Sequence, residues 1–205
     1  MNYDIKAYPT RYNGTQFRSR LEAKWAAFFD LCGWRWEYEP FDFEGWVPDF
    51  LIKGSDKNLL VEVKPYSWTN DDTHSCNLVC ESDVLGKLFR ANREEVLLLG
   101  AYPLGGERWL GSRLGIFVNS PDCEELMGSE YVVAKPNSGG ISGYIDFTVL
   151  NFGQSHKYDV SADHGFYTLR LGGEYAGDHF LNPVGGDEVT KLWREASNRV
   201  QKQFK

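Results

Sequence analysis

The chain has 205 residues, of which 42% are hydrophobic and 15% aromatic, enough to build a sizeable core in one large domain or one domain with an extension. Its net charge of −7 argues against a protein that coats nucleic acid through a general positive field. The first residues contain no apolar signal segment, and no later run has the length of a membrane span. We therefore expect a soluble, cytoplasmic protein with no membrane partner.

The first expected element is an amphipathic helix over residues 16–33. Apolar residues recur there at spacings of three and four: Phe17, Leu21, Trp25, Phe28 and Cys32. Thr15 can cap the start of this helix, and Gly33 can end it. At about 100° per residue, Arg18 and Glu22 fall on one edge of the apolar stripe, so both should border the core.

Short strands follow the helix. Three stretches rich in aromatic or β-branched residues are separated by Gly, Asp, Ser or Asn, which predicts three strands. A helix with an apolar side comes next, and then a strand of the buried type and a further strand. The sequence thus predicts strands within residues 34–40, 45–53 and 58–65, a helix within 82–94, and strands within 95–103 and 113–119. This order of elements indicates an α/β fold.

The later part of the chain is Gly-rich. Alternating apolar stretches at 144–152 and 166–173 predict β-hairpins that pack on the core or form a flap. The segment at 187–205 predicts a docked helix with a basic outer face, since apolar side chains recur on one side: Val189, Leu192, Trp193, Ala196 and Val200. We divide the chain into a core at 1–125 and, packed on it, a β-rich extension with a C-terminal helix at 126–205.

Three charged residues interrupt the most apolar strands. Asp49 follows a proline in one strand, and Glu62 and Lys64 share a face of the next, because side chains alternate along a strand. Neighbouring carboxylates repel and are costly to bury, so they need a cation or a proton. Carboxylate oxygens suit Mg²⁺ or Mn²⁺, which commonly engage substrate phosphates. The residues therefore fit a phosphodiester-hydrolysis site in which Lys64 positions the nucleophile and stabilises negative charge.

These residues resemble a known signature. The proline and aspartate at 48–49, followed by the EVK run at 62–64 on the next strand, are similar to the pattern of PD-(D/E)XK nucleases. Many members carry a glutamate on the preceding helix, and Glu22 stands at that place. The arrangement looks like a phage or bacterial member of the superfamily. The resemblance covers residues 16–103 well and the remainder poorly.

The resemblance implies a restriction-endonuclease-like core, ordered as helix, three strands, helix and strand, and an Mg²⁺-dependent enzyme that cleaves DNA. It implies that Asp49 and Glu62 hold the metal with help from the Val63 carbonyl. By the same resemblance, Lys64 is catalytic and Glu22 is an accessory acid at the metal. Mn²⁺ is expected to substitute for Mg²⁺. No Walker-type phosphate loop occurs in the sequence, so we expect no nucleotide cofactor.

Other interpretations of the same residues remain open. Glu62 or Asp49 could simply form an ion pair with Lys64 at a sheet edge. The chain could be a catalytically silent module that keeps the nuclease fold and binds nucleic acid or a protein partner. The run from the helix to the EVK motif is also similar to the endonuclease subunit of Tns-type transposases. Those subunits usually add a winged-helix domain, and the Gly-rich region after residue 120 departs from that pattern.

Several basic and aromatic residues are candidates for binding. Arg18 and Arg20 flank Glu22 and could contact a phosphate backbone, or could be plain helix-surface charges. The basic face of the last helix could lie along DNA or be merely solvated, and its candidate residues are Lys191, Arg194 and Lys202. Many nucleases of this fold are homodimers, and an aromatic-rich set could form the interface or its own core: Tyr144, Phe147, Phe152, Phe166 and Tyr167.

The four cysteines are sparse and unevenly spaced, which indicates free thiols in a reducing compartment. His74, Cys76 and Cys80 are close in sequence and could suggest a zinc site. They lack the second pair of ligands that a structural site needs, unless Cys123 or a distant His supplies it. We therefore favour a site of carboxylates over a zinc site.

Overall fold

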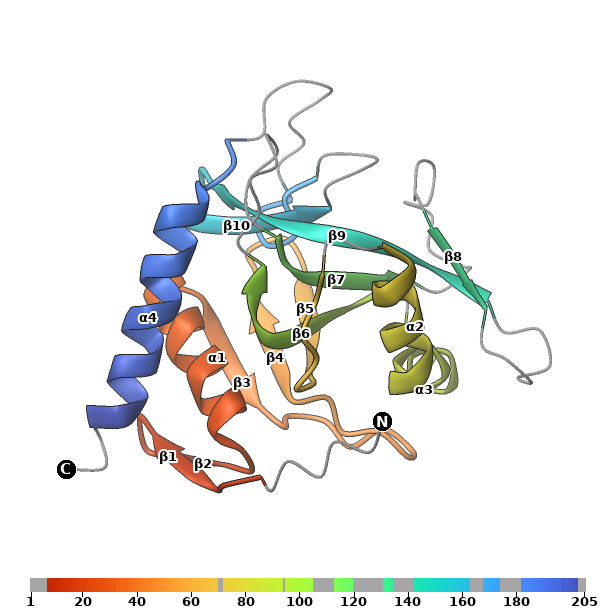
Figure 1. Ribbon diagram of the computed structural model, residues 1–205, viewed down its shortest axis with the longest axis horizontal. Helices are drawn as coiled ribbons and strands as arrows, with labels where there is room; N and C mark the ends of the chain where they lie inside the picture. Colours follow the sequence, from red (N-terminus) through yellow and green to blue (C-terminus); the bar gives the residue numbers. More distant parts are fainter. Residues whose placement is uncertain are drawn as a thin grey trace.

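The core of the chain is a large, mostly antiparallel sheet with helices on both sides (Figure 1). The computed structural model describes residues 7–69, 72–93, 95–104, 113–119, 131–134, 142–162, 168–173 and 182–202. Within these residues the fold is mixed α/β with four helices, as the sequence predicts at that level. None of the described helices is long and apolar enough to cross a membrane.

The first helix is shorter than the sequence predicts. Residues 15–17 belong to a small hairpin, because Asn13 and Gly14 take left-handed φ values of 47° and 83° and turn the chain sharply. The helix is therefore capped by Ser19 and not by Thr15, which corrects the predicted start. Gly33 ends it as predicted, with a left-handed φ of 75°. The bounds are β1 (Thr10–Tyr12), β2 (Thr15–Phe17) and α1 (Arg20–Cys32).

The central elements follow the predicted order with one addition. Three strands form an antiparallel meander, a helical crossover follows, and the next strand returns parallel to the third. The sequence did not predict α2, whose Ser, Thr, Asn and Cys residues form helices weakly and show no clear apolar stripe. The bounds are β3 (Arg35–Tyr38), β4 (Phe50–Lys53), β5 (Asn58–Val63), α2 (Asp72–Ser82), α3 (Val84–Arg90), β6 (Glu95–Leu104) and β7 (Arg113–Asn119).

The Gly-rich part extends the same sheet. Strand β9 pairs antiparallel with β7, and both β8 and β10 pair with β9, so the order β10-β9-β7-β6-β5-β4-β3 runs through the whole fold. The described residues of the predicted strand at 166–173 form a turn against β10, where the Arg170 N–H donates to the Val160 carbonyl at 2.8 Å. The bounds are β8 (Tyr131–Ala134), β9 (Ser142–Phe152), β10 (Tyr158–Ala162) and α4 (Gly186–Lys202).

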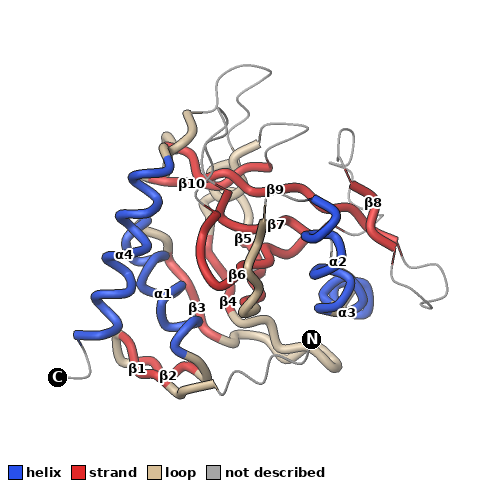
Figure 2. The backbone as a smooth tube through the Cα atoms, in the orientation of Figure 1, coloured by secondary structure: helices blue, strands red, loops and turns tan. Residues whose placement is uncertain are grey.

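Two hydrophobic clusters lie on opposite faces of the sheet. Leu59, Val61 and Val63 of β5 face the cluster that contains α1 and α4, whereas Leu60 faces the cluster that contains α2 and α3. Figure 2 shows the two helix pairs on the two sides of the strands. This alternation puts Glu62 on the side of α3, as the strand period predicts.

Helix α4 completes the first cluster. Its predicted apolar face is buried against α1, and the ring centroids of Trp193 and Trp25 lie 4.7 Å apart. Trp25 is fully buried, and its indole N–H donates to the Gly100 carbonyl on β6 at 2.9 Å. This one side chain therefore joins α1, α4 and the sheet.

Replacing Trp25 should weaken the fold strongly. Trp25→Ala removes a buried aromatic side chain and leaves the Gly100 carbonyl without its donor, so we expect the free energy of unfolding to drop by about 3–5 kcal/mol. Urea denaturation measures this value. Phe89→Ala is the control, because Phe89 is 50% exposed on α3 and its loss should change the value by about 0.5 kcal/mol or less. Equal losses in the two variants would contradict the packing described here.

Candidate active site

The two predicted metal-binding acids are neighbours at the end of the β4–β5 ladder. The register pairs Phe50 with Val61, so the next positions bring Asp49 beside Glu62. The Val63 backbone N–H donates to Asp49 Oδ2 at 2.7 Å, which fixes the acid against β5. Both carboxylates are nearly inaccessible, with exposed fractions of 4% for Asp49 and 2% for Glu62. Two buried acids next to each other require compensating positive charge or a proton.

Lysines and a tryptophan surround Glu62. Lys64 Nζ and Lys87 Nζ lie 2.7 and 3.0 Å from Glu62 Oε1, and the Trp46 indole N–H donates to Oε2 at 2.9 Å. Burial alone would raise the pKa of Glu62, but the lysines and the indole donor outweigh it and hold the pKa below the ordinary value. Glu62 is therefore ionised and fully hydrogen-bonded.

Asp49 is less well compensated. Arg18 Nη2 lies 2.6 Å from Asp49 Oδ1, while Arg18 Nε lies 2.7 Å from Glu39 Oε1, so one guanidinium serves two acids. Burial raises the pKa of Asp49 to about 7, and the negative charges of Glu62 and Glu22 add to this. The site therefore holds one firmly ionised acid and one acid that titrates near neutrality.

Glu22 joins the site from the first turn of α1. Ser19 Oγ donates to Glu22 Oε1 at 2.7 Å while the Glu22 N–H donates back to Ser19 Oγ, which is a capping arrangement. Glu22 Oε2 accepts from the Tyr38 hydroxyl at 2.5 Å and from the Arg18 backbone N–H at 3.1 Å. The same backbone segment thus connects Glu22 to Asp49 through Arg18.

The four predicted site residues are therefore brought together, but as a network of acids and cations. In the part of the chain that the structure describes, no three His, Cys, Asp or Glu side chains form a metal-ligand group. The described hydrogen bond of Val63 uses its N–H, whereas the prediction concerned its carbonyl. His74, Cys76 and Cys80 lie on α2, and Cys123 lies outside the described residues.

Sequence reasoning missed several members of the network, Glu39 and Ser19 among them. Three others come from further elements. Lys87 comes from α3, Trp46 from the β3–β4 loop, and Tyr38 from β3. A lysine on the polar side of the crossover helix carries no distinguishing spacing. The signal for Trp46 was its position three residues before Asp49, which places a donor near the acid-bearing strands.

Two cavities meet at Lys64. One, of about 350 Å³, is lined by Arg18, Trp46, Glu62, Lys64 and Lys87 among others. The second, of about 500 Å³, lies on the side of the α1 N-terminus and is lined by Ser19, Arg20, Glu22 and Lys64 among others. Lys64 thus lies between a hollow lined by three cationic and two acidic side chains and the N-terminus of α1, where Ser19 and Glu22 already cap the helix.

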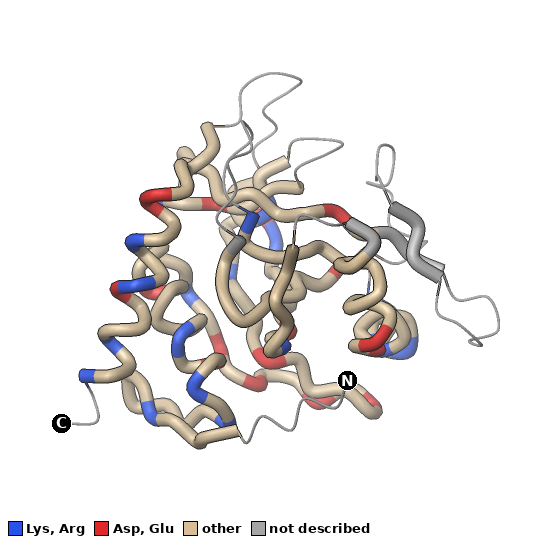
Figure 3. Tube along the Cα trace, viewed as in Figure 1, with Lys and Arg blue, Asp and Glu red and all other residues tan. Residues whose placement is uncertain are grey.

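The other predicted binding residues lie in different places. Arg20 is exposed at the start of α1 beside the second cavity. Positive residues recur along α4 (Figure 3), but its exposed candidates line neither cavity: Lys191, Arg194 and Lys202. In the aromatic set, Phe147 is buried in the core and Phe152 is 44% exposed. The side chain of Tyr144 and residues 166–167 lie outside the described part.

Comparison with protein-family models, with curated proteins and with solved structures finds no match to this chain. The resemblance to a nuclease family therefore rests on the motif and on the geometry just described.

The raised pKa of Asp49 predicts a pH effect on stability. The folded chain holds this proton up to about pH 7, whereas the unfolded chain loses it near the ordinary value of 3.8. Between these values the folded state binds more protons, so the Asp49 contribution to the free energy of unfolding falls as pH rises. Asp49→Asn removes the titration. We expect its free energy of unfolding to fall less over this pH range than that of the native chain, measured by urea denaturation.

Glu37→Gln is the control for this experiment, since Glu37 is a half-exposed acid on β3 that pairs with Lys53. Its pH profile should follow that of the native chain. Superimposable profiles for Asp49→Asn and the native chain would show that Asp49 titrates normally.

Proposed function

We propose that the chain is a metal-dependent DNA endonuclease of the PD-(D/E)XK class. The observation that carries the proposal is the meeting of Asp49, Glu62 and Lys64 on adjoining strands, with Glu22 linked to them from the preceding helix. The order α1, β3, β4, β5, helical crossover and β6 supports the proposal, because the expected core has its elements in this order.

The donor set suits a hard divalent cation. Asp49 is a buried carboxylate whose pKa is raised by burial and by neighbouring acids, so an added cation would stabilise its ionised form. Asp49 and Glu62 would hold the ion, with the Val63 carbonyl and Glu22 as the further groups that the resemblance implies. Bound there, Mg²⁺ or Mn²⁺ would polarise the scissile phosphate and lower the pKa of a water. Arg18 and Lys64 now donate hydrogen bonds to oxygens of Asp49 and Glu62, and these hydrogen bonds would have to break for those oxygens to bind the ion.

Lys64 is suited to act as a cation. Burial alone would lower the pKa of Lys64, but Glu62 and Asp49 raise it above the ordinary value, so the amine is protonated at neutral pH. A protonated amine at the meeting point of two cavities can bind a phosphate oxygen and stabilise charge that develops during cleavage. Lys87 places a second amino group in one of these cavities, with its Nζ 3.0 Å from Glu62 Oε1.

The first test is cleavage of supercoiled plasmid, linear duplex, single-stranded and branched DNA with Mg²⁺, Mn²⁺ or EDTA. We expect metal-dependent cutting, reduced at least about a hundred-fold in Asp49→Asn and in Lys64→Ala, because each removes a charge at the reacting phosphate. Glu37→Gln is the matched carboxylate control and should cut normally. Unchanged cutting in Asp49→Asn and Lys64→Ala would show that the site is elsewhere.

A second prediction concerns metal binding. A divalent ion must displace the proton from Asp49, so its affinity should fall by up to about ten-fold per pH unit below about pH 7 and level off above it. Calorimetry with Mn²⁺ in buffers of different ionisation enthalpy should show release of about one proton below pH 7. Binding that persists in Asp49→Asn with the same pH dependence would place the ion at another site.

One observation favours a second candidate, a nuclease-fold module that binds nucleic acid without cutting it. Arg18, Lys64 and Lys87 already compensate the two acids, as in a structural ion-pair network. Such a module would bind DNA equally well in EDTA and in Mg²⁺ and would cut no substrate. The cleavage and calorimetry experiments separate the two candidates.

A further inference from the structure

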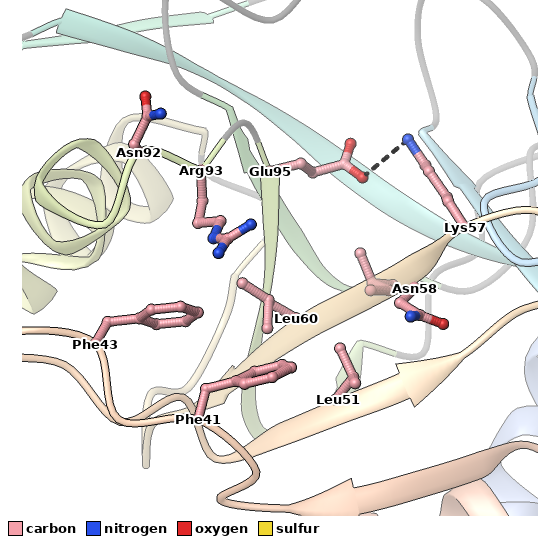
Figure 4. Close-up of a pocket in the computed structure, with 10 residues that line it drawn as sticks. Phe41, Phe43, Leu51, Lys57, Asn58, Leu60, Asn92, Arg93 and Glu95 are labelled. Carbon is pink, nitrogen blue, oxygen red and sulfur yellow. Dashed lines mark ion pairs between the residues drawn. The ribbon is translucent and has the colours of Figure 1, made fainter.

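A third hollow, of about 430 Å³, lies beside the site on the α3 side of the sheet (Figure 4). Leu51 and Leu60 of β4 and β5 are among its buried lining residues, and Phe41 and Phe43 of the β3–β4 loop form one wall. The segment after α3 and the starts of β5 and β6 contribute further polar groups. The polar lining residues are Lys57, Asn58, Asn92, Arg93 and Glu95.

The wall of this pocket is a stack of planar groups. The rings of Phe41 and Phe43 are stacked with centroids 5.5 Å apart and planes at 30°. The Arg93 guanidinium lies 4.8 Å from the centre of the Phe43 ring. Phe41 is nevertheless 41% exposed, so the stack ends in an aromatic side chain that is only partly covered. A flat ligand can extend such a stack.

The same aromatic loop reaches the proposed catalytic acids. Phe43 and Trp46 pair through two backbone hydrogen bonds of 2.8 and 2.7 Å, and their rings lie 5.7 Å apart. The Trp46 indole then donates to Glu62 Oε2. Three successive rings therefore lead from the pocket to Glu62.

The polar groups around the pocket suit the edge of a nucleobase. The exposed Asn58 and Asn92 carry amides that both donate and accept hydrogen bonds, as base edges do. At the far end, Lys57 Nζ lies 3.7 Å from Glu95 Oε1, which closes that side with an ion pair (Figure 4). Aromatic faces next to amides and a guanidinium are the groups with which proteins hold unstacked bases.

We propose that this pocket binds an unpaired base of single-stranded DNA, next to the position where the strand is cut. The inference rests on the proposed function, in which the nearby acids take part in cleavage, and it adds the substrate class, single-stranded DNA. A base inside a duplex is stacked on both faces and cannot enter the pocket without being extruded, which costs free energy. The chain should therefore prefer single-stranded, frayed or branched DNA to continuous duplex.

The test measures binding of a fluorescein-labelled single strand, and of the same strand in a duplex, by fluorescence anisotropy in EDTA, so that metal-dependent cutting does not occur. Phe41→Ala should weaken single-strand binding by about ten-fold, because stacking on one aromatic side chain contributes on that order. Phe41→Trp should restore the affinity. Phe89→Ala removes a phenylalanine outside the pocket that is 50% exposed, against 41% for Phe41, and should leave binding unchanged. Duplex binding should change by less than about two-fold in Phe41→Ala.

The outcomes separate this inference from the proposed function. No measurable binding of the single strand by the native chain, no loss in Phe41→Ala, or an equal loss for strand and duplex would overturn the base pocket, while metal-dependent cutting could still be observed. Single-strand binding that depends on Phe41 without cutting in any metal would uphold the pocket and reject the nuclease.

Discussion

The candidate site depends on the burial of two adjacent acids at the end of one strand pair. The hydrogen bond from the Val63 N–H to Asp49 holds the first acid in place, and the ladder register brings Glu62 beside it. Three cations compensate the charge that this creates: Arg18 at Asp49, and Lys64 and Lys87 at Glu62. These cations come from the β2–α1 link, the end of β5 and α3. The charges of Asp49 and Glu62 therefore connect three separate parts of the fold.

The order of the central strands and of α3 could be predicted from the sequence because each has a strong local signal, whereas α2 has none and was missed. A short run rich in apolar and β-branched residues, bounded by turn residues, defines β5, and a longer apolar run of the buried type defines β6. The predicted start of α1 was wrong, since helical periodicity continues through Phe17 while Asn13 and Gly14 impose a turn that makes this residue part of a strand. Phe17 is still fully buried, so this apolar side chain packs in the core from a strand just as it would from the predicted helix.

The site was predictable where one motif placed its residues and not where distant segments meet. Alternation along one strand places Glu62 and Lys64 on the same face, and the pairing of consecutive strands brings Asp49 beside them. Lys87 depends on how α3 packs over the sheet, which the spacing of its residues does not reveal. Trp46 depends on how the β3–β4 loop packs, and only its closeness to Asp49 in the sequence pointed to the site. The position of Arg18 also escaped prediction: outside the helix, its guanidinium reaches across to Asp49 and Glu39.

The packing of α4 on α1 has a consequence for the order in which the chain can fold. Trp25 is covered by Trp193, a residue 168 positions later, calculated as 193 minus 25. Helix α1 therefore cannot bury its apolar face completely until residues 186–202 have been synthesised. The same helix carries Glu22, and the residue before its cap is Arg18, so the charge network around Asp49 is attached to a helix whose packing only residues 186–202 complete. Contact between segments far apart in the sequence therefore stabilises the element that holds Glu22 in place.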